Sequence, residues 1–405
     1  MINPSEIPGR APSRRWRPER VDPVNYDLDQ LDLERLRSRR SVKWTYFDKD
    51  VLPAWVAEMD FPLADPVRGA LIAAIERDDS GYANAEASGL GLAFSDFMDR
   101  RLDWKPDPGQ IVATSDVVGG ITSLLRALTE PGDGVIITPP VYHPFFQLIR
   151  EVGCEVFEAP MLKGRNLDLD AIEAGFKAGA KAMILCSPHN PAGTVPARSE
   201  LERIAELAAE HEAWILSDEI HAPLTLKGTE FLPFLGISGA AAEWGICLSS
   251  ASKTFNLAGL TCAVFASASA RAKEVIESLP FGAKHPGHLG VISSRAAFES
   301  GDDWLDQVLA QLDRNRHLLG ELLREHMPEV GYTPPEAGYL AWLDCRLLDL
   351  GDDPSEAFLE TGRVALSPGP QFGSQGAGFG RLNIATSPAI IEEAVKRMAK
   401  VVHCA

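Results

Sequence analysis

The chain has 405 residues, of which 45% are hydrophobic and 24% charged, a composition typical of an ordinary soluble globular protein. Its 39 basic and 57 acidic residues give a net charge of -18, which argues against a nucleic-acid partner or an anionic membrane surface. No stretch approaches 18 apolar residues and the N-terminus lacks a continuous apolar segment, so neither secretion nor membrane spanning is expected.

The six cysteines are scattered and contain no CxxC pair. This usage favours a reducing cytoplasm and buried thiols over disulfides or a zinc cage. The first 25 residues are rich in arginine and proline, and we expect an extended arm there that is disordered or packed on a partner subunit. A chain of this length can build one large domain and a smaller one.

From about residue 65 to 300, short β-branched apolar runs alternate with amphipathic helical stretches. The predicted strands are 110–114, 134–138, 155–158, 181–186, 213–217, 245–249 and 262–266, and the predicted helices are 119–130, 144–151, 168–178 and 198–210. Continuous apolar strands separated by such helices indicate a mostly parallel sheet covered on both faces. Ligands of such sheets bind beyond the carboxyl ends of the strands.

After residue 300 the pattern changes to a long helix at 303–325, strand-like runs at 339–344 and 381–385, a helix near 354–361 and a last helix at 388–402. This order predicts a smaller α+β domain, completed by the segment before residue 60. The predicted organisation is an arm (1–25), an N-terminal part of the small domain (26–60), a large domain (61–300) and the C-terminal small domain (301–405).

Lys253 is the candidate nucleophile. It lies in SSASKTFNLAGL shortly after the apolar run 245–249, beside Ser250 and Ser252, and is thus poorly placed for solvation. A lysine in such a place suits Schiff-base formation with an aldehyde. A lone loop lysine is ordinarily a surface residue, and it is the neighbouring motifs that favour the nucleophile.

The stretch LSDEIHAPL (216–224) spans the end of the run 213–217 and places Asp218, Glu219 and His221 close together. A metal site is one interpretation, but no other ligand cluster completes a coordination shell. In the other interpretation, Asp218 faces a pyridine nitrogen and keeps it protonated, so that the ring becomes an electron sink. Glu219 then points the opposite way and is structural.

Other strand ends offer further groups for one organic phosphate cofactor. Asn190 in HNPAGT could donate its amide to a phenolate oxygen, and Tyr142 in PPVYHPF could lay its ring on a flat heteroaromatic face. The amides of Val117 and Val118 would open a helix at a site for phosphate. Arg381 in GRLNIATS could bind a substrate carboxylate bidentately. An ordinary turn and a packed loop aromatic are the alternatives for Asn190 and Tyr142.

Two glycine-rich stretches, GLGLAF at 89–94 and GAGFGR at 376–381, lack the GxGxxG spacing between a strand and a helix. The chain contains no GxxxxGK[ST] and no HExxH. Nucleotide hydrolysis and a catalytic metal are therefore not expected.

The order Tyr, NPxG, DExH, SxSK and Arg resembles the fold-type I pyridoxal-phosphate (PLP) enzymes, the aspartate aminotransferase superfamily. The chain is most similar to the MalY/PatB group of cystathionine beta-lyases, from RRSVKW (39–44) through LPAWVAEMDF (52–61) and SDEIHAPL (217–224) to SKTFNLAGL (252–260). The resemblance implies an α/β fold with a mostly parallel seven-stranded sheet, PLP as the cofactor, and an amino acid as the small-molecule substrate.

The resemblance also implies roles for single residues. These are Lys253 as Schiff-base lysine and catalytic base, Asp218 at the pyridine nitrogen, Asn190 at the ring hydroxyl and the substrate, Tyr142 on the ring, Arg381 on the substrate carboxylate, and His221, Ser250, Ser252, Val117 and Val118 around the cofactor. Tyr82 in SGYAN corresponds to a tyrosine that reaches the cofactor phosphate from the neighbouring subunit, which implies a homodimer.

The chain departs from the wider superfamily at His221, where a tyrosine is common, and at Thr261, where a phosphate-binding arginine is common. Both departures fit the lyase group. Asp116 brings a negative charge close to the presumed phosphate site, unless it caps the helix near 119 and points away.

The leading hypothesis is β-elimination on an L-cysteine S-conjugate such as cystathionine, which yields a thiol, pyruvate and ammonia. The alternative enzyme is an aminotransferase, because the same lysine, aspartate and cofactor serve both reactions. A third hypothesis is a protein of this fold that is retained as a binding or regulatory partner. The expected location is the cytoplasm.

Overall fold

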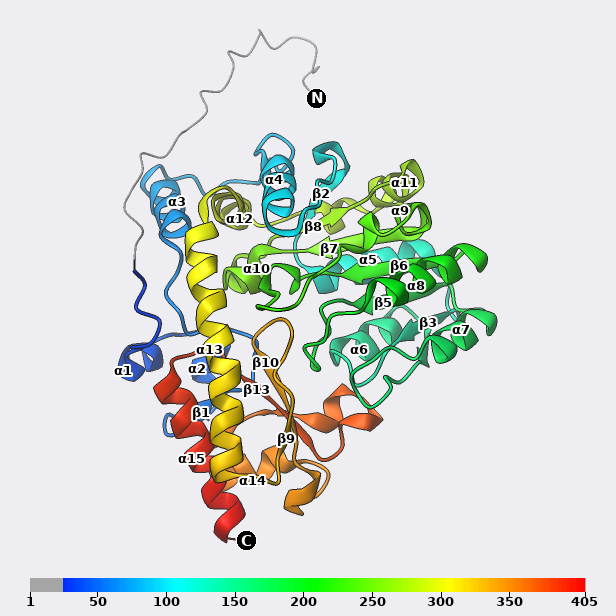
Figure 1. The fold of residues 1–405 in the computed structure, drawn as a ribbon. Helices are drawn as coiled ribbons and strands as arrows, with labels where there is room; N and C mark the ends of the chain where they lie inside the picture. Colours follow the sequence, from blue (N-terminus) through cyan, green and yellow to red (C-terminus); the bar gives the residue numbers. More distant parts are fainter. Residues whose placement is uncertain (1–24, 405) are drawn as a thin grey trace.

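The computed structural model describes residues 25–404, so the predicted arm lies outside the described residues except for its last position. Two layered parts are joined along the long helix α13 (Asp302–His326), which runs past both of them (Figure 1). Between residues 25 and 404 no helix is long and apolar enough to cross a membrane.

The larger part is built on a seven-stranded sheet with the order β2-β8-β7-β6-β5-β3-β4. β8 runs antiparallel to both of its neighbours, and the other neighbouring pairs are parallel. The strands are β2 (Ile111–Thr114), β3 (Gly134–Ile137), β4 (Glu155–Glu158), β5 (Ala182–Cys186), β6 (Trp214–Asp218), β7 (Gly245–Ser249) and β8 (Ala263–Ala266). The predicted mostly parallel seven-stranded sheet is confirmed, and each strand end lies within one residue of its prediction.

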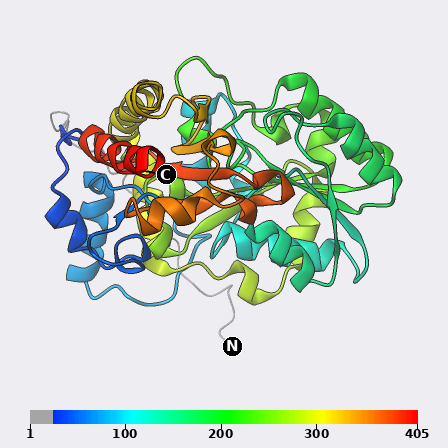
Figure 2. The ribbon, with the colours of Figure 1, turned by 90° about the horizontal axis from the view of Figure 1, so that it is seen from below.

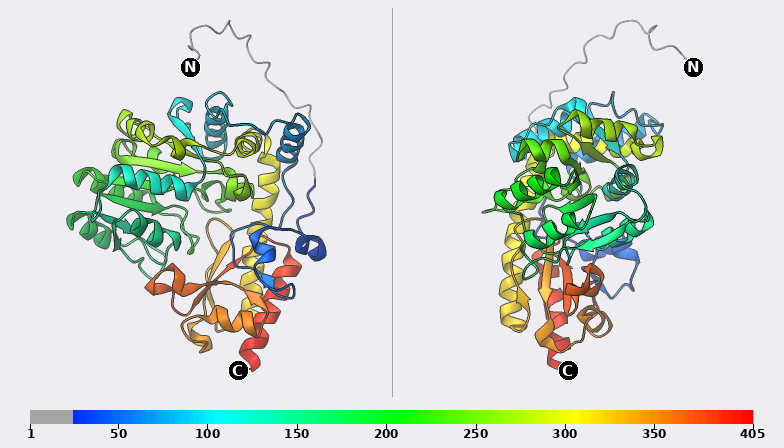
Figure 3. Two further views of the ribbon diagram at one scale, coloured as in Figure 1. Left: turned by 180° about the vertical axis from the view of Figure 1, so that it is seen from behind. Right: turned by 90° about the vertical axis from the view of Figure 1, so that its right-hand side faces the viewer.

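The central strands of this sheet are fully buried, whereas the edge strand β4 is exposed at both ends. Helices cover both faces (Figure 3). They include α5 (Val117–Leu128), α6 (Pro144–Glu151), α7 (Leu169–Lys177), α8 (Arg198–Glu210), α9 (Gly239–Trp244) and α11 (Ala270–Ser278). Burial on both faces explains why these strands read as continuous apolar runs.

The helices α9 and α11 were not predicted, and neither were α3 (Asp65–Glu76), α4 (Leu90–Leu102), α10 (Ala251–Thr254) and α12 (His288–Ser300). The stretch GLGLAF forms the start of α4 and not a nucleotide loop. α5 begins two residues before the predicted position, because the Asp116 side chain accepts the Gly119 amide at 2.7 Å and caps the helix.

The smaller part contains the antiparallel sheet β12-β13-β10-β9, seen from below in Figure 2. Its elements are β9 (Gly331–Tyr332), β10 (Leu340–Asp344), β12 (Ser367–Pro368), β13 (Phe379–Asn383), α14 (Pro354–Glu360) and α15 (Pro388–Cys404), and α15 packs against α13. The segment before residue 60 joins this part, since β1 (Leu52–Pro53) pairs in parallel with β11 (Val364–Ala365). The exact domain boundaries stay a prediction.

Candidate active site

A cavity of about 820 Å³ opens beyond the carboxyl ends of the large sheet, between that sheet and the smaller part. The predicted residues that line it are Val117, Val118, Tyr142, Asn190, Asp218, His221, Ser250, Ser252, Lys253 and Arg381. Among the predicted site residues, Tyr82 does not line it. The cavity therefore brings together side chains from five strand ends at the edge where ligands of parallel sheets bind.

Lys253 lies in the short helix α10 (Ala251–Thr254), which follows β7 directly. Its Nζ donates to the Ala57 carbonyl at 3.1 Å. Burial, followed by the nearby Arg381 charge, lowers the pKa of this amine from 10.5 to about 8. A buried amine of this pKa is partly neutral near pH 7 and can act as a nucleophile or base.

The two serines beside Lys253 shape the turn that carries it. The Ser250 hydroxyl donates to the Cys262 carbonyl at 2.6 Å and accepts the Ser252 amide at 3.0 Å. Ser250 thus ties α10 to the neighbouring chain segment before β8, while its hydroxyl proton is already committed to that carbonyl.

The adjacent carboxyls of Asp218 and Glu219 separate as expected. Asp218 ends β6 and lines the cavity, and burial raises its pKa to about 6. Glu219 accepts the Phe234 amide and the Ser217 hydroxyl, each at 2.9 Å, and burial raises its pKa to about 7. Glu219 therefore binds the loop after β6 and serves structure, while Asp218 faces the cavity.

His221 lies at the start of the turn η3 (Ala222–Leu224), with its ring 6.0 Å from that of Tyr339 in an edge-on arrangement. Its side chain is buried and Nδ1 has no hydrogen-bond partner. Burial, with the Lys253 and Arg381 charges nearby, lowers the pKa to about 3, so the imidazole is neutral. A neutral ring with one unpartnered nitrogen at the cavity wall suits a polar ligand group.

Arg381 is buried in β13 and forms no ion pair with an acidic residue in the part of the chain that the structure describes. Its guanidinium donates to Asn190 Oδ1 at 3.0 Å, to the Trp55 carbonyl at 3.0 Å and to Ser367 Oγ at 2.9 Å, while Nε has no partner. Burial lowers its pKa to about 10. A buried cation held only by neutral groups is suited to an anionic ligand.

The N-terminus of α5 forms another wall of the cavity. The amides of Val117 and Val118 lie in the first turn of the helix, where they lack intrahelical acceptors. Asp116 caps this helix, as the sequence suggested, and still lines the cavity. Its carboxylate also accepts a hydrogen bond from the Ser115 hydroxyl at 3.0 Å, so two donors, Ser115 and Gly119, stabilise its negative charge.

Tyr142 lines the cavity as predicted and packs edge-on against Phe145 at 5.5 Å between ring centroids. Tyr82, by contrast, is 89% exposed, and its ring lies 5.9 Å from that of His285. Its predicted contact belongs to a neighbouring subunit and stays a prediction.

Sequence reasoning missed several cavity residues, among them Trp55, Val56, Ala57 and His143. His143 was recognisable as the residue after Tyr142, and burial lowers its pKa to about 4. The stretch WVAEMD contains no side chains that predict a site, because it contributes backbone carbonyls, which every residue has.

The groups in this cavity fit a phosphorylated pyridine aldehyde such as PLP. The low-pKa amine suits the aldehyde, the buried carboxyl suits a pyridine nitrogen, and the unpartnered His221 Nδ1 suits a polar substituent of the ring. The helix N-terminus suits the phosphate. No group of three or more potential metal ligands occurs within residues 25–404.

Comparisons with known proteins agree with this fit. Residues 49–398 match the family model described as aminotransferase class I and II. A Mycobacterium leprae protein provisionally named a cystathionine beta-lyase is 41% identical over 92% of this chain and 97% of the relative. The cystathionine beta-lyase of Corynebacterium glutamicum is 36% identical over 91% of this chain and 99% of the relative.

Solved structures show the same fold. Cystalysin from Treponema denticola, whose crystal structure contains pyridoxal 5'-phosphate, superposes with a TM-score of 0.88 over 94% of this chain and all of that chain, with 27% sequence identity.

Proposed function

Because the chain belongs to the aminotransferase class I and II family, we propose that it is a PLP-dependent carbon-sulfur β-lyase. It cleaves L-cystathionine or a related L-cysteine S-conjugate to a thiol, pyruvate and ammonia. The observation that carries the proposal is one cavity, holding Lys253, Asp218 and Arg381, in a chain whose relatives are named cystathionine beta-lyases.

PLP, when bound, supplies the electron sink that stabilises negative charge at the substrate Cα. The chain supplies the residues that hold it. In the proposed arrangement Asp218 lies at the pyridine nitrogen, Asn190 and His221 at the ring hydroxyl, Tyr142 on the ring face, and the Val117 and Val118 amides with Ser250 and Ser252 near the phosphate. Burial raises the pKa of Asp218 although the Lys253 charge opposes this shift, and a protonated pyridine nitrogen beside it would further favour the charged carboxylate.

Lys253 binds the cofactor aldehyde and, once free, takes the proton from the substrate Cα on its Nζ. Its pKa of about 8 supports this role, because a general base works best when its pKa lies near the operating pH. The amine must be neutral to accept the proton, so the rate should rise with pH as the lysine loses its own proton.

Arg381 orients the substrate through its carboxylate. The guanidinium is fixed by Asn190, Ser367 and the Trp55 carbonyl before any substrate arrives, and its fork can bind both carboxylate oxygens. Because the guanidinium is ordered in advance, we expect it to hold the substrate Cα near Lys253 at little further ordering cost.

The proposed enzyme is a cytoplasmic homodimer in which Tyr82 of one subunit reaches the cofactor phosphate of the other. The exposure of Tyr82 supports an intersubunit role, since a tyrosine with 89% of its surface exposed gains little from its own chain. The five cysteines with described side chains are unpaired and buried, which is typical of a reducing compartment.

The proposal is tested by giving the purified protein PLP and L-cystathionine and measuring thiol release and the visible absorbance of the bound cofactor. Lys253→Ala should abolish both. Lys181→Ala is the matched control, because Lys181 is exposed and precedes β5 at the opposite edge of the sheet. An unmodified protein that binds PLP but releases no thiol would contradict the lyase, and an unchanged spectrum in Lys253→Ala would contradict the lysine assignment.

A further inference from the structure

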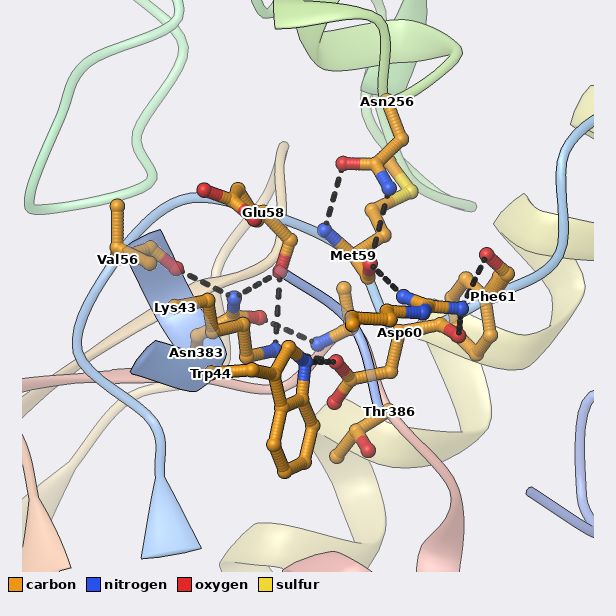
Figure 4. Close-up of polar contacts among 12 residues, drawn as sticks. Lys43, Trp44, Val56, Glu58, Met59, Asp60, Phe61, Asn256, Asn383 and Thr386 are labelled. Atoms are coloured by element: carbon orange, nitrogen blue, oxygen red, sulfur yellow. Dashed lines mark hydrogen bonds and ion pairs between the residues drawn. The ribbon is translucent and has the colours of Figure 1, made fainter. Parts of the chain in front are cut away.

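Residues 55–61, WVAEMDF, form an irregular segment that we call the strap. Each of its seven backbone carbonyls accepts a hydrogen bond from a side chain, and Figure 4 shows the surroundings of Val56 and of Glu58 to Phe61. The donors are Arg381 and Ser367 to Trp55, Asn383 to Val56, Lys253 and Tyr339 to Ala57, Lys43 and Asn383 to Glu58, Arg39 and Asn256 to Met59, and Arg39 to Asp60 and Phe61.

The donors to the strap come from distant regions of the sequence. Arg39 and Lys43 precede it, Asn256 lies three residues after Lys253, and Asn383 ends β13. Asn383 donates to the Val56 and Glu58 carbonyls at 2.7 Å each, so it brackets Ala57. The backbone at Ala57 is thus fixed on both sides by buried groups.

The Ala57 carbonyl is shared by two donors. Lys253 Nζ and the Tyr339 hydroxyl each lie 3.1 Å from its oxygen. Tyr339 is fully buried and directly precedes β10, and its hydroxyl donates its proton in this bond. A carbonyl has two lone pairs, so it can accept both donors, but each donor reduces its attraction for the other.

We propose that Tyr339 is a positioning residue for Lys253: its hydroxyl fixes the Ala57 carbonyl, and that carbonyl holds the free lysine amine in place to take the Cα proton. This inference rests on the proposed function, because it gives the strap a role in that proton transfer. Tyr339 acts through the carbonyl, since it does not line the cavity.

Loss of the Tyr339 hydroxyl has a predictable effect on proton binding. With only one donor left, the Ala57 carbonyl stabilises the charged lysine better, so the amine stays protonated to higher pH. The other charged or titratable groups that act on Lys253 or respond to it are Asp218, Glu58, Arg381 and His221, and all remain in the variant. A change in the pH dependence can therefore be assigned to the shared carbonyl.

The test compares Tyr339→Phe with Tyr332→Phe. Tyr332 is the matched control, because its hydroxyl also donates to a backbone carbonyl, that of Arg316 at 3.0 Å, and it does not line the cavity. Two quantities are measured: steady-state turnover of L-cystathionine against pH, and the rate at which cofactor-free protein takes up PLP against pH, followed by visible absorbance.

For Tyr339→Phe we expect kcat at neutral pH to fall about tenfold, the scale of one lost hydrogen bond, with KM within about twofold. The midpoints of both pH profiles should move to higher pH, while those of Tyr332→Phe stay at the unmodified value. Equal midpoints in the two variants would overturn the proposal. PLP uptake requires no turnover, so this result is separate from the proposed function, which fails if the unmodified protein takes up PLP and releases no thiol.

If turnover of Tyr339→Phe is too low to measure, a double-mutant cycle of unfolding temperatures tests the shared carbonyl. In cofactor-free protein, Tyr339→Phe and Lys253→Met each leave one donor on the Ala57 carbonyl, and the double variant leaves none. A buried unsatisfied carbonyl is costly, so the double variant should lose more unfolding temperature than the two single losses together. Additive losses would overturn the shared-carbonyl account.

Discussion

Replacement of Lys43 by methionine should destabilise the protein far more than the loss of an ordinary lysine. Lys43 in α2 (Val42–Thr45) and Asp60 in the strap are each only 2% exposed, and Nζ lies 2.9 Å from Asp60 Oδ1. In Lys43→Met the Asp60 carboxylate still accepts the Trp44 indole N–H at 3.2 Å but loses its ion-pair partner (Figure 4). The variant therefore leaves a buried carboxylate without a direct ion pair.

The expected cost is about 3 to 5 kcal/mol, the usual range when one partner of a buried ion pair is removed. A chain of this length has an unfolding entropy of about 0.85 kcal/mol per kelvin, so the unfolding temperature should fall by roughly 4 to 6 °C. Differential scanning calorimetry at neutral pH measures this shift.

Two further variants separate the loss of the buried ion pair from the loss of any lysine. Lys273→Met removes an exposed lysine of α11 whose partner Glu277 lies 3.8 Å away, and it should cost less than about 1 °C. The double variant Lys43→Met/Asp60→Leu removes both buried charges and should recover most of the loss. A shift in Lys43→Met no larger than in Lys273→Met, or no recovery in the double variant, would refute the account of the pair.

Three further changes test other parts of the site. Arg381→Lys replaces a bidentate fork by a point charge, so KM for L-cystathionine should rise at least about tenfold in steady-state kinetics, and an unchanged KM would contradict carboxylate binding. Burial raises the pKa of Glu219 from 4.5 to about 7, so this group's contribution to stability is present below pH 4.5 and is lost as pH rises through 7. Glu219→Gln should flatten that fall in unfolding temperature, and curves parallel to those of the unmodified protein would contradict the buried charge. Burial lowers the pKa of Lys253 from 10.5 to about 8, so the unfolded chain binds more protons between these values and the stability of cofactor-free protein gains from this group as pH rises across them. In urea unfolding, the free energy of unfolding of Lys253→Met should not show this gain with pH. If it rises with pH as much as that of the unmodified protein, the gain comes from other groups.

The sequence predicted the large sheet well for a physical reason. Strands β5, β6 and β7 are buried on both faces, so their residues form continuous apolar runs, and polar residues such as Asp218 and Lys253 then mark the strand ends. The order of strands in a sheet fixes which ends meet. The cavity residues that follow strands could therefore be predicted together.

The strap could not be predicted in the same way. Its contribution lies in backbone carbonyls such as that of Ala57, which any sequence possesses, and in donors from distant positions such as Lys43 and Asn383. The sequence predicted Tyr339 only as the first residue of a strand-like run, although its hydroxyl donates to the Ala57 carbonyl of the strap. Only the packing of the two parts brings these groups to one place.

Elimination of a thiol is tested by product formation from L-cystathionine, measured for the PLP-loaded protein with and without a 2-oxo acid acceptor. We expect equal amounts of pyruvate and thiol without the acceptor, and no increase when the acceptor is added. Strict dependence on the acceptor with no thiol released would contradict elimination and would identify an aminotransferase.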